Sequence, residues 1–242
     1  MNTTKLDLKH KPLLVAHRGC SGLERENTGA AFIAAGNRSY WGIETDIHRT
    51  GDGNFILIHD ADTQRVANDR ILVEESTLDT LRQITLCNKY TGEKDRRGLC
   101  LPTLAEYIAI CKHYEKHAVL ELKSSFSEQE LDRIVCEIAA ADYLDHTTFI
   151  SFHYETLVLL RANHPDVSAQ FLIGKELPEN WLELLCAQKL DLDVYYKNLT
   201  KDMVRICHKN GIKVNCWTVD DPAVAVQLAK WGVDQITTNI LE

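Results

Sequence analysis

Polar residues of the kinds used in acid/base and metal chemistry occur in four short motifs of this chain. Each motif ends an apolar run: His17-Arg18-Gly19, Glu44-x-Asp46, His59-Asp60 and Glu121-x-Lys123. Residues two apart on a strand project to the same side, about 7 Å apart along the backbone. Glu44 and Asp46 can therefore lean onto one cation, and Glu121 can supply a third oxygen ligand from a neighbouring strand.

The ligand types indicate which cation such a site would hold and which substrate would suit it. Three carboxylates without a cysteine favour a hard cation, Mg²⁺ or Ca²⁺, over zinc. With a divalent cation, Arg18, Lys123 and one protonated histidine, the site would carry a net charge of about +2, which matches the charge of about −2 on the pentacoordinate transition state of a phosphodiester. His17 and His59 would complete an acid/base pair, because histidine titrates near neutral pH.

The composition is that of an ordinary globular protein, with 45% hydrophobic residues in a chain of 242. A formal net charge of −8 and the lack of a basic run argue against a nucleic-acid partner. The amino terminus lacks the apolar stretch of a secretory signal, and no run approaches 18 consecutive apolar residues. We therefore expect a cytoplasmic protein without a membrane span, and we interpret its eight cysteines as buried or partly buried thiols, not as a disulfide framework.

The spacing of apolar runs predicts how the polar motifs are positioned. Eight runs of strand length are predicted at Leu13–His17, Gly42–Asp46, Ala118–Leu122, Thr147–Ser151, Ser168–Leu172, Asp191–Tyr195, Lys213–Trp217 and Val233–Thr237. Helical patterns fall between them, at Leu104–Tyr114, Glu128–Ala141, Tyr154–Asn163, Met203–Lys209 and Ala223–Lys230. This alternation predicts an α/β fold, a TIM (β/α)8 barrel, as a single domain over residues 1–242. The alternative is an open doubly wound sheet, which the lack of a GxGxxG after the first strand disfavours.

Two segments depart from this alternation. The turn residues Gly51–Asn54 lie between Glu44–Arg49 and Phe55–His59, so we expect a small hairpin after the second strand. Residues 85–101 are polar and predict a surface loop. Residues 60–101 are too few for a large inserted cap domain, which predicts a pocket that is open on that side.

The predicted barrel brings the four motifs together, because the carboxyl ends of its strands form one face that carries the active site. Trp217 ends the seventh strand on the same face, and Phe152 follows the fourth. Either residue could form a wall for the substrate or fill the barrel interior by packing. His48 lies near the motifs and is expected to be a solvated polar residue.

In this order, the motifs resemble those of the glycerophosphodiester phosphodiesterase family. The matching stretches extend from about residue 12 to residue 240: VAHRG (15–19), ENT (26–28), GIETDIHRTGDGNFILIHD (42–60), LPTLAEY (101–107), LELK (120–123), ISF (150–152), CWTVDDP (216–222) and GVDQITTN (232–239). The chain departs from the family pattern at Arg25, which replaces a usual proline, and at Asn239, which replaces a usual aspartate.

The resemblance implies a metal-dependent phosphoric diester hydrolase with a TIM-barrel fold. Its small-molecule substrates would be glycerophosphodiesters, which it would cleave to sn-glycerol 3-phosphate and an alcohol. The implied catalytic acid/base groups are His17 and His59, the implied metal ligands are Glu44, Asp46 and Glu121, and the implied phosphate contacts are Arg18 and Lys123.

Several alternatives stay open at this point. Arg18 could orient Glu26 instead of a phosphate. The nucleophile could be water or the glycerol 2-hydroxyl, and we favour His17 as base and His59 as acid without excluding the reverse. A lysophospholipase D-like or sphingomyelinase D-like enzyme and a barrel that binds phosphorylated metabolites without turnover are the rival functions. The sequence leaves open the head group, the physiological cation and the oligomeric state.

Overall fold

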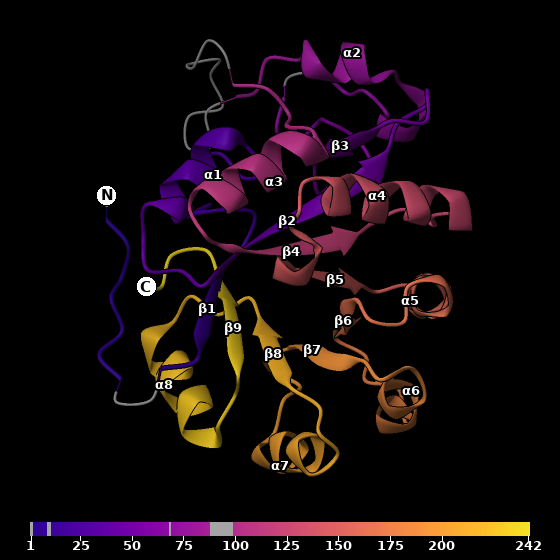
Figure 1. The fold of residues 1–242 in the computed structure, drawn as a ribbon. Helices are drawn as coiled ribbons and strands as arrows, with labels where there is room; N and C mark the ends of the chain where they lie inside the picture. The colour runs from indigo at the N-terminus through magenta and orange to yellow at the C-terminus, as the bar shows by residue number, and fades with distance from the viewer. Residues whose placement is uncertain (1, 9–10, 68, 88–98) are drawn as a thin grey trace.

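The apolar runs of the sequence form strands of one continuous sheet. The computed structural model describes residues 2–8, 11–67, 69–87 and 99–242, and in these residues eight parallel strands close into a ring (Figure 1). Around the ring they are β1 (Leu13–Ala16), β2 (Gly42–Arg49), β4 (His117–Leu122), β5 (Thr147–Ser151), β6 (Ser168–Ile173), β7 (Asp191–Tyr195), β8 (Val214–Trp217) and β9 (Gln235–Thr238). Because β1 pairs with both β2 and β9, the predicted closed barrel is confirmed and the open sheet is wrong.

The side chains of each strand alternate between the outside and the inside of the barrel. Outward residues such as Ile43 and Leu120 belong to the main core between sheet and helices. Val15, Val119, Ile150 and Leu172 come from different strands and form a separate buried cluster within the ring. The barrel is therefore filled by side chains below its carboxyl rim.

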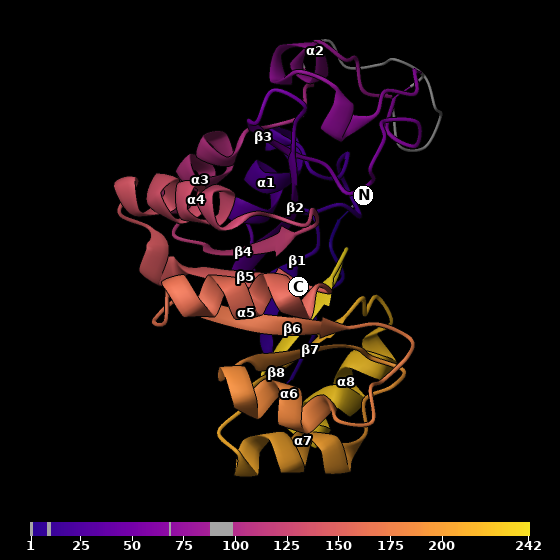
Figure 2. The ribbon, with the colours of Figure 1, turned by 90° about the vertical axis from the view of Figure 1, so that its right-hand side faces the viewer.

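Seven helices of the described residues cover the outer face of the sheet (Figures 1 and 2). They are α1 (Gly29–Gly36), α3 (Leu104–His113), α4 (Glu128–Ala140), α5 (Tyr154–Asn163), α6 (Trp181–Gln188), α7 (Lys201–Lys209) and α8 (Pro222–Trp231). Thr103 and Ser127 begin α3 and α4 with capping boxes, which satisfy backbone N–H groups that a helix leaves free. The predicted helices agree with these bounds to within two residues. The predictions named neither α1 nor α6. The sequence of α1, GAAFIAAG, has no polar face to give it an amphipathic pattern, and only Glu183 and Gln188 interrupt the apolar residues of α6.

The predicted hairpin after the second strand is confirmed. Strand β3 (Phe55–Leu57) pairs antiparallel with β2, outside the ring. The chain then forms a side lobe, residues 61–87, which contains the short helices η1 (Val73–Glu75) and α2 (Leu78–Arg82) and packs on its own small core with Ile56 and Ile58. The lobe extends beyond β3 on one side of the barrel (Figure 2). Most of the loop predicted at 85–101 lies outside the described residues.

The structure also bears on what the sequence predicted for the cysteines and for a membrane span. None of the eight cysteines, all of which lie in the described residues, forms a disulfide. Cys136 and Cys186 are exposed, however, so the expectation that every thiol is buried or partly buried is wrong for these two. Both lie on the outer helices α4 and α6, which have a solvent face. No helix of the described residues is long and apolar enough to cross a membrane.

Tyr107 of α3 joins the two strands that carry the acidic motifs. Its buried hydroxyl donates a hydrogen bond to the Ile43 carbonyl of β2 at 2.7 Å and accepts one from the Val119 N–H of β4 at 3.0 Å. One side chain thus satisfies a backbone acceptor and a backbone donor on neighbouring strands. The positions of Glu44 and Glu121, each within two residues of these groups, depend on this contact.

We expect Tyr107→Phe to lower the free energy of unfolding by about 1–3 kcal/mol, because it leaves two buried backbone groups without a partner. Urea denaturation measures this loss. Tyr143→Phe is the matched control: its hydroxyl lies 2.8 Å from the Lys116 carbonyl and 3.0 Å from the Cys111 carbonyl, and one O–H can donate to only one of them at full strength. A loss for Tyr107→Phe no greater than that for Tyr143→Phe would show that the strands pair without the bridging hydroxyl.

Candidate active site

The polar motifs meet around one cavity of about 210 Å³ at the carboxyl ends of the strands. Seven of the nine residues predicted for the site line it: His17, Arg18, Glu44, His59, Glu121, Phe152 and Trp217. The other two, Asp46 and Lys123, pair with Arg18 and Glu121. A larger hollow of about 370 Å³ lies near the amino ends of β5 and β6, away from all four motifs. The chemistry-bearing residues thus lie in the smaller cavity.

Three buried carboxylates lie side by side at this rim. One oxygen from each of Glu44, Asp46 and Glu121 falls within 4.8 Å of the others. Burial, together with the charge of Asp46, raises the pKa of Glu121 to about 8 and that of Glu44 well above its usual range. Burial also acts to raise the pKa of Asp46, but Arg18, His59 and Lys123 more than offset it and hold that pKa below its usual range.

The same three residues fit a hard divalent cation. Asp46 Oδ1 is buried and has no hydrogen-bond partner among the described residues, since Lys123 Nζ lies 3.7 Å away. An unpaired carboxylate oxygen beside two carboxyl groups that favour protons is costly in a buried site. A cation coordinated by oxygen would remove both costs, and the donor set of three carboxylates is of the kind that Mg²⁺ and Ca²⁺ prefer.

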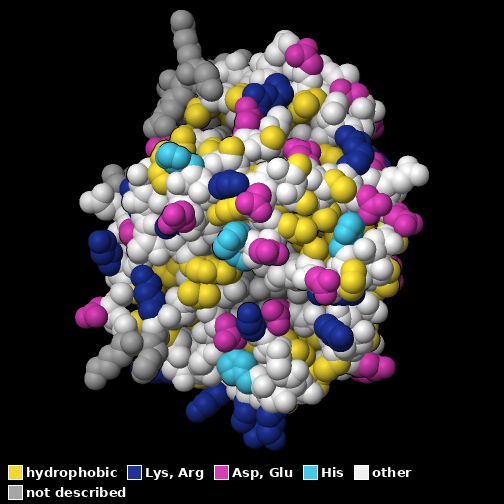
Figure 3. Space-filling model, in the orientation of Figure 1, with side chains coloured by type: hydrophobic (Ala, Val, Ile, Leu, Met, Phe, Trp, Pro, Cys, Tyr) yellow, Lys and Arg dark blue, Asp and Glu magenta, His cyan; other side chains and the backbone are white. Residues whose placement is uncertain are grey.

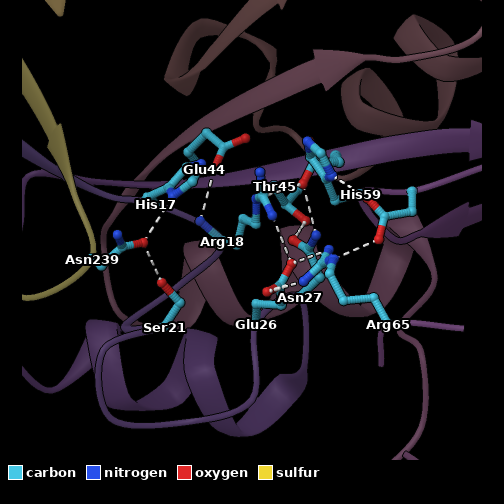
Figure 4. A network of polar contacts seen from close by, with 12 residues as sticks. His17, Arg18, Ser21, Glu26, Asn27, Glu44, Thr45, His59, Arg65 and Asn239 are labelled. Carbon is cyan, nitrogen blue, oxygen red and sulfur yellow. Dashed lines mark hydrogen bonds and ion pairs between the residues drawn. The ribbon is translucent and has the colours of Figure 1, made fainter. Parts of the chain in front are cut away.

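His17 follows β1 directly and is held by a neutral partner. Its Nδ1–H donates to Asn239 Oδ1 at 2.8 Å (Figure 4). The Asn239 amide is itself fixed, because its Nδ2 donates to the Asp220 carboxylate at 2.6 Å and Ser21 Oγ donates to its Oδ1 at 2.7 Å. This contact fixes the tautomer of His17 with a free Nε2, and burial, with the positive charge of Arg18, lowers its pKa to about 4.

His59 follows β3 and is held by a charged partner. Its Nδ1–H donates to Asp60 Oδ1 at 2.6 Å, and Asp60 accepts a hydrogen bond from Arg65 of the side lobe at 2.6 Å. Arg65 also binds both oxygens of Glu26 (Figure 4). Burial lowers the pKa of His59 below its ordinary value, while Asp46 and Asp60 oppose that shift. The two histidines therefore differ in what stabilises their protonated form.

Arg18 is tied into the site by both its backbone and its side chain. Its N–H donates to Glu44 at 2.8 Å, and its Nη1 pairs with Glu26 at 2.7 Å. The contact with Glu26, which the sequence left open, is therefore present. Arg18 has φ 55° and Gly19 φ 77°, both in the left-handed region. A Cβ at Gly19 would lie 2.6 Å from the Ala31 backbone, so the HRG motif requires glycine there.

Sequence reasoning missed several residues of the site. Asn27 donates to Asp46 Oδ2 at 2.7 Å and accepts from the Thr45 hydroxyl at 2.7 Å. Asn27 and Asn239 both lie in stretches that match the family, which was a usable signal, whereas Arg65 carried none. His48 was predicted to be solvated, which is wrong: it is 5% exposed, and its Nε2 contacts the His59 carbonyl at 3.2 Å. His48 is part of the hairpin strand β2, opposite Ile56 of β3, and Glu74 of the side lobe lies 3.7 Å from its Nδ1.

Two aromatic residues form one wall of the cavity. Phe152 and Trp217 pack edge to face with ring centroids 5.5 Å apart, and both line the cavity. Lys123 Nζ lies 5.9 Å from the Phe152 ring, on the side of the carboxylates. The two rings therefore pack on each other and line the cavity, and their role as a wall for the substrate stays a prediction.

On the face seen in Figure 3, Lys and Arg are interspersed with Asp and Glu over most of the surface, and several basic side chains lie together at the lower edge. The positive charge near the cavity is local, since it comes from Arg18 and Lys123 beside the carboxylates.

Comparison with known proteins places these features among phosphodiesterases. A glycerophosphodiester phosphodiesterase of Caldanaerobacter subterraneus subsp. tengcongensis is 31% identical over 95% of this chain and 94% of its own length. A solved Oleispira antarctica phosphodiesterase, in complex with the product sn-glycerol-3-phosphate, is 25% identical with a TM-score of 0.81, over 95% of this chain and 93% of that one.

A Silicibacter pomeroyi structure described as a putative glycerophosphoryl diester phosphodiesterase shares the fold, with a TM-score of 0.86 and 20% identity over 97% of this chain and 92% of its own. The family model described as the glycerophosphoryl diester phosphodiesterase family matches residues 17–242. With that match over nearly its whole length, the chain belongs to the glycerophosphoryl diester phosphodiesterase family.

Proposed function

We propose that this protein hydrolyses glycerophosphodiesters to sn-glycerol 3-phosphate and an alcohol, using a divalent cation and two histidines. The observation that carries the proposal is the meeting of three buried carboxylates with His17 and His59 at one cavity. Family membership and the product complex of the Oleispira antarctica enzyme support it.

Glu44, Asp46 and Glu121 would hold the cation, Mg²⁺ or Ca²⁺. When bound, it would supply positive charge that offsets the charge growing on the phosphoryl oxygens. Arg18 and Lys123 would stabilise the same negative charge on the phosphoryl oxygens, because their positively charged side chains lie beside the carboxylates. Ion pairs with Glu26, Asp46 and Glu121 hold the two side chains in this position. Their guanidinium and ammonium groups would orient the phosphodiester at the rim.

The partners of the two histidines support a division of labour. His17 has a free Nε2 and a pKa lowered to about 4, so it is neutral at physiological pH and can accept a proton from the nucleophile. Burial lowers the pKa of His59, and the Asp60 carboxylate opposes this shift by stabilising the protonated ring, so we assign His59 as the donor to the departing alcohol. The nucleophile is water or the glycerol 2-hydroxyl, which would form a cyclic phosphate.

Removal of divalent cations should abolish turnover of glycerophosphocholine, by at least about 100-fold, because three buried carboxylates without a cation repel one another and the phosphodiester. Release of glycerol 3-phosphate is measured in a coupled assay before and after chelation, with the metal content verified. Adding back Mg²⁺ or Ca²⁺ should restore the rate and raise the melting temperature. Full activity in the metal-free protein would contradict the metal assignment.

His17→Ala and His59→Ala should each lower kcat by about 10²–10⁴, the usual contribution of a general acid or base. The two variants should differ on substrates with different leaving groups. Choline needs a proton to leave and p-nitrophenolate does not. The rate constant of His59→Ala should therefore fall much less on the p-nitrophenyl diester than on glycerophosphocholine. The rate constant of His17→Ala should fall on both substrates, because the nucleophile needs activation in either case.

The comparison needs kcat/KM for each variant on both substrates, and a gap of about 1.4 kcal/mol between them is a tenfold effect. His153→Ala is the control, since His153 is exposed beside the rim and does not line the cavity. It should keep the wild-type rates. The reverse pattern would exchange the roles of His17 and His59, and equal losses throughout would refute the division between them.

Asn239→Asp should move the acid limb of the pH profile upward. A carboxylate against Nδ1 of His17 would stabilise the imidazolium and raise its pKa. The change is made together with Asp220→Asn, because the Asn239 amide donates to the Asp220 carboxylate and two carboxylates there would repel each other. Since the base must be neutral, activity would then be lost at a higher pH as the solution is acidified. The profile of kcat/KM at saturating cation measures this shift, and the alkaline limb, which His59 sets as the acid, should stay in place. An unmoved acid limb would mean that His17 is not the base.

A further inference from the structure

A buried carboxyl group on the inner wall of the cavity has no role in the mechanism above. Asp193 lies in the middle of β7, is 1% exposed and lines the cavity. Its Oδ1 has no hydrogen-bond partner in the described parts of the chain. Burial raises the pKa of Asp193 to about 7, and a hydrogen bond with Asn215 only partly offsets this. An unpaired carboxyl oxygen at such a position destabilises the fold, so a ligand is the natural partner for it.

The neighbouring strand presents an unused donor to the same cavity. Trp217 ends β8, and its Nε1–H is buried without a hydrogen-bond partner among the residues described. Strands β7 and β8 are paired, with Tyr195 opposite Trp217. The cavity wall thus offers one free acceptor and one free donor. A hydroxyl group, which donates one hydrogen bond and accepts others, matches that pair.

The order of strands separates this wall from the carboxylates. Around the eight-stranded ring of the described residues, β7 lies four positions from β2 and β8 lies four positions from β4 by either route, so the two pairs of strands face each other across the barrel. A glycerophosphodiester whose phosphate lies at Glu44 and Glu121 would extend its glycerol moiety toward Asp193 and Trp217. The cavity holds about 210 Å³, below the roughly 300 Å³ at which pockets for drug-sized ligands begin.

We propose that Asp193 and Trp217 form a subsite that selects the free hydroxyl groups of the glycerol moiety; this inference rests on the proposed function. Asp193 accepts a hydrogen bond from a glycerol hydroxyl, and Trp217 donates one to a hydroxyl oxygen. A lysophospholipid keeps one free glycerol hydroxyl, but its other glycerol oxygen is an ester that has no hydrogen to donate, and its acyl chain exceeds the cavity of about 210 Å³. The subsite therefore directs the enzyme to deacylated glycerophosphodiesters and against lysophospholipids.

The test compares two ligands that differ only in these hydroxyls, sn-glycerol 3-phosphate and n-propyl phosphate. Titration calorimetry with the full chain in the presence of Ca²⁺ gives a Kd for each, independently of turnover. We expect the wild type to bind glycerol 3-phosphate on the order of 100-fold more tightly, because propyl phosphate leaves the buried polar groups unpaired. Asp193→Leu should reduce this preference to about tenfold or less.

Two further variants and a control make the result specific. Trp217→Phe keeps the aromatic wall without the donor and should also reduce the preference. Gln170→Leu is the matched control: Gln170 is 2% exposed and its Oε1 is likewise unpaired within the described chain, but it does not line the cavity. It should keep the wild-type preference. Since Asp193→Leu removes an unpaired carboxyl group, its melting temperature should be no lower than that of the wild type.

If Asp193→Leu does not fold, the preferences of Asp193→Asn and Trp217→Phe decide the outcome, and Asp193→Asn should retain part of the preference through its amide oxygen. Undiminished preference in the folded variants, or no preference in the wild type, would overturn the subsite. A wild type that prefers glycerol 3-phosphate but releases none from glycerophosphocholine would support the subsite and refute the proposed hydrolysis. Normal hydrolysis with unchanged preferences would refute the subsite alone.

Discussion

Repulsion among three carboxylates within 4.8 Å of one another is the constraint around which this site is arranged. Burial strengthens that repulsion, because little water screens the charges. Three neighbours of Asp46 reduce this repulsion. Arg18 and Lys123 bring positive charge to its carboxylate, and Asn27 donates a hydrogen bond to it. The contacts of the rim therefore keep Asp46 ionised while leaving one of its oxygens unused, which is the state in which a carboxylate is ready to bind a cation.

The barrel makes this arrangement stable, since each acid is carried by a strand that is paired on both sides. Asp46 lies opposite Glu121 in the β2–β4 register, and Tyr107 joins the same two strands through backbone contacts. After the neighbouring strand β1, Gly19 allows the chain to turn sharply behind His17, so that the Arg18 N–H reaches Glu44. Paired strands set the distances among the acids, and one tight turn brings His17 and Arg18 beside them.

The site residues that could be predicted from the sequence are those in which a chemically reactive side chain stands at the end of a predicted strand. His17, Glu44, Asp46 and Glu121 end apolar runs, so a closed barrel was enough to bring them to one rim. Arg65 could not be predicted in this way, because it acts through Glu26 and Asp60, and that contact exists only after the side lobe has folded. Asp193 was hidden for another reason: one acid in an apolar strand has no pattern, and its unpaired oxygen is a property of the packed barrel. His48 was assigned to solvent because the sequence gives the hairpin but not the contact of this histidine with the side lobe.

The side lobe reaches His59 through a chain of charges, Glu26–Arg65–Asp60, that alternates in sign. The guanidinium of Arg65 lies between two acids that belong to different parts of the site, since Glu26 also pairs with Arg18 and Asp60 with His59. A change in the lobe that displaces Arg65 would therefore reach Arg18 and His59 together, whereas a change at Glu74 would disturb His48 and Arg49 instead.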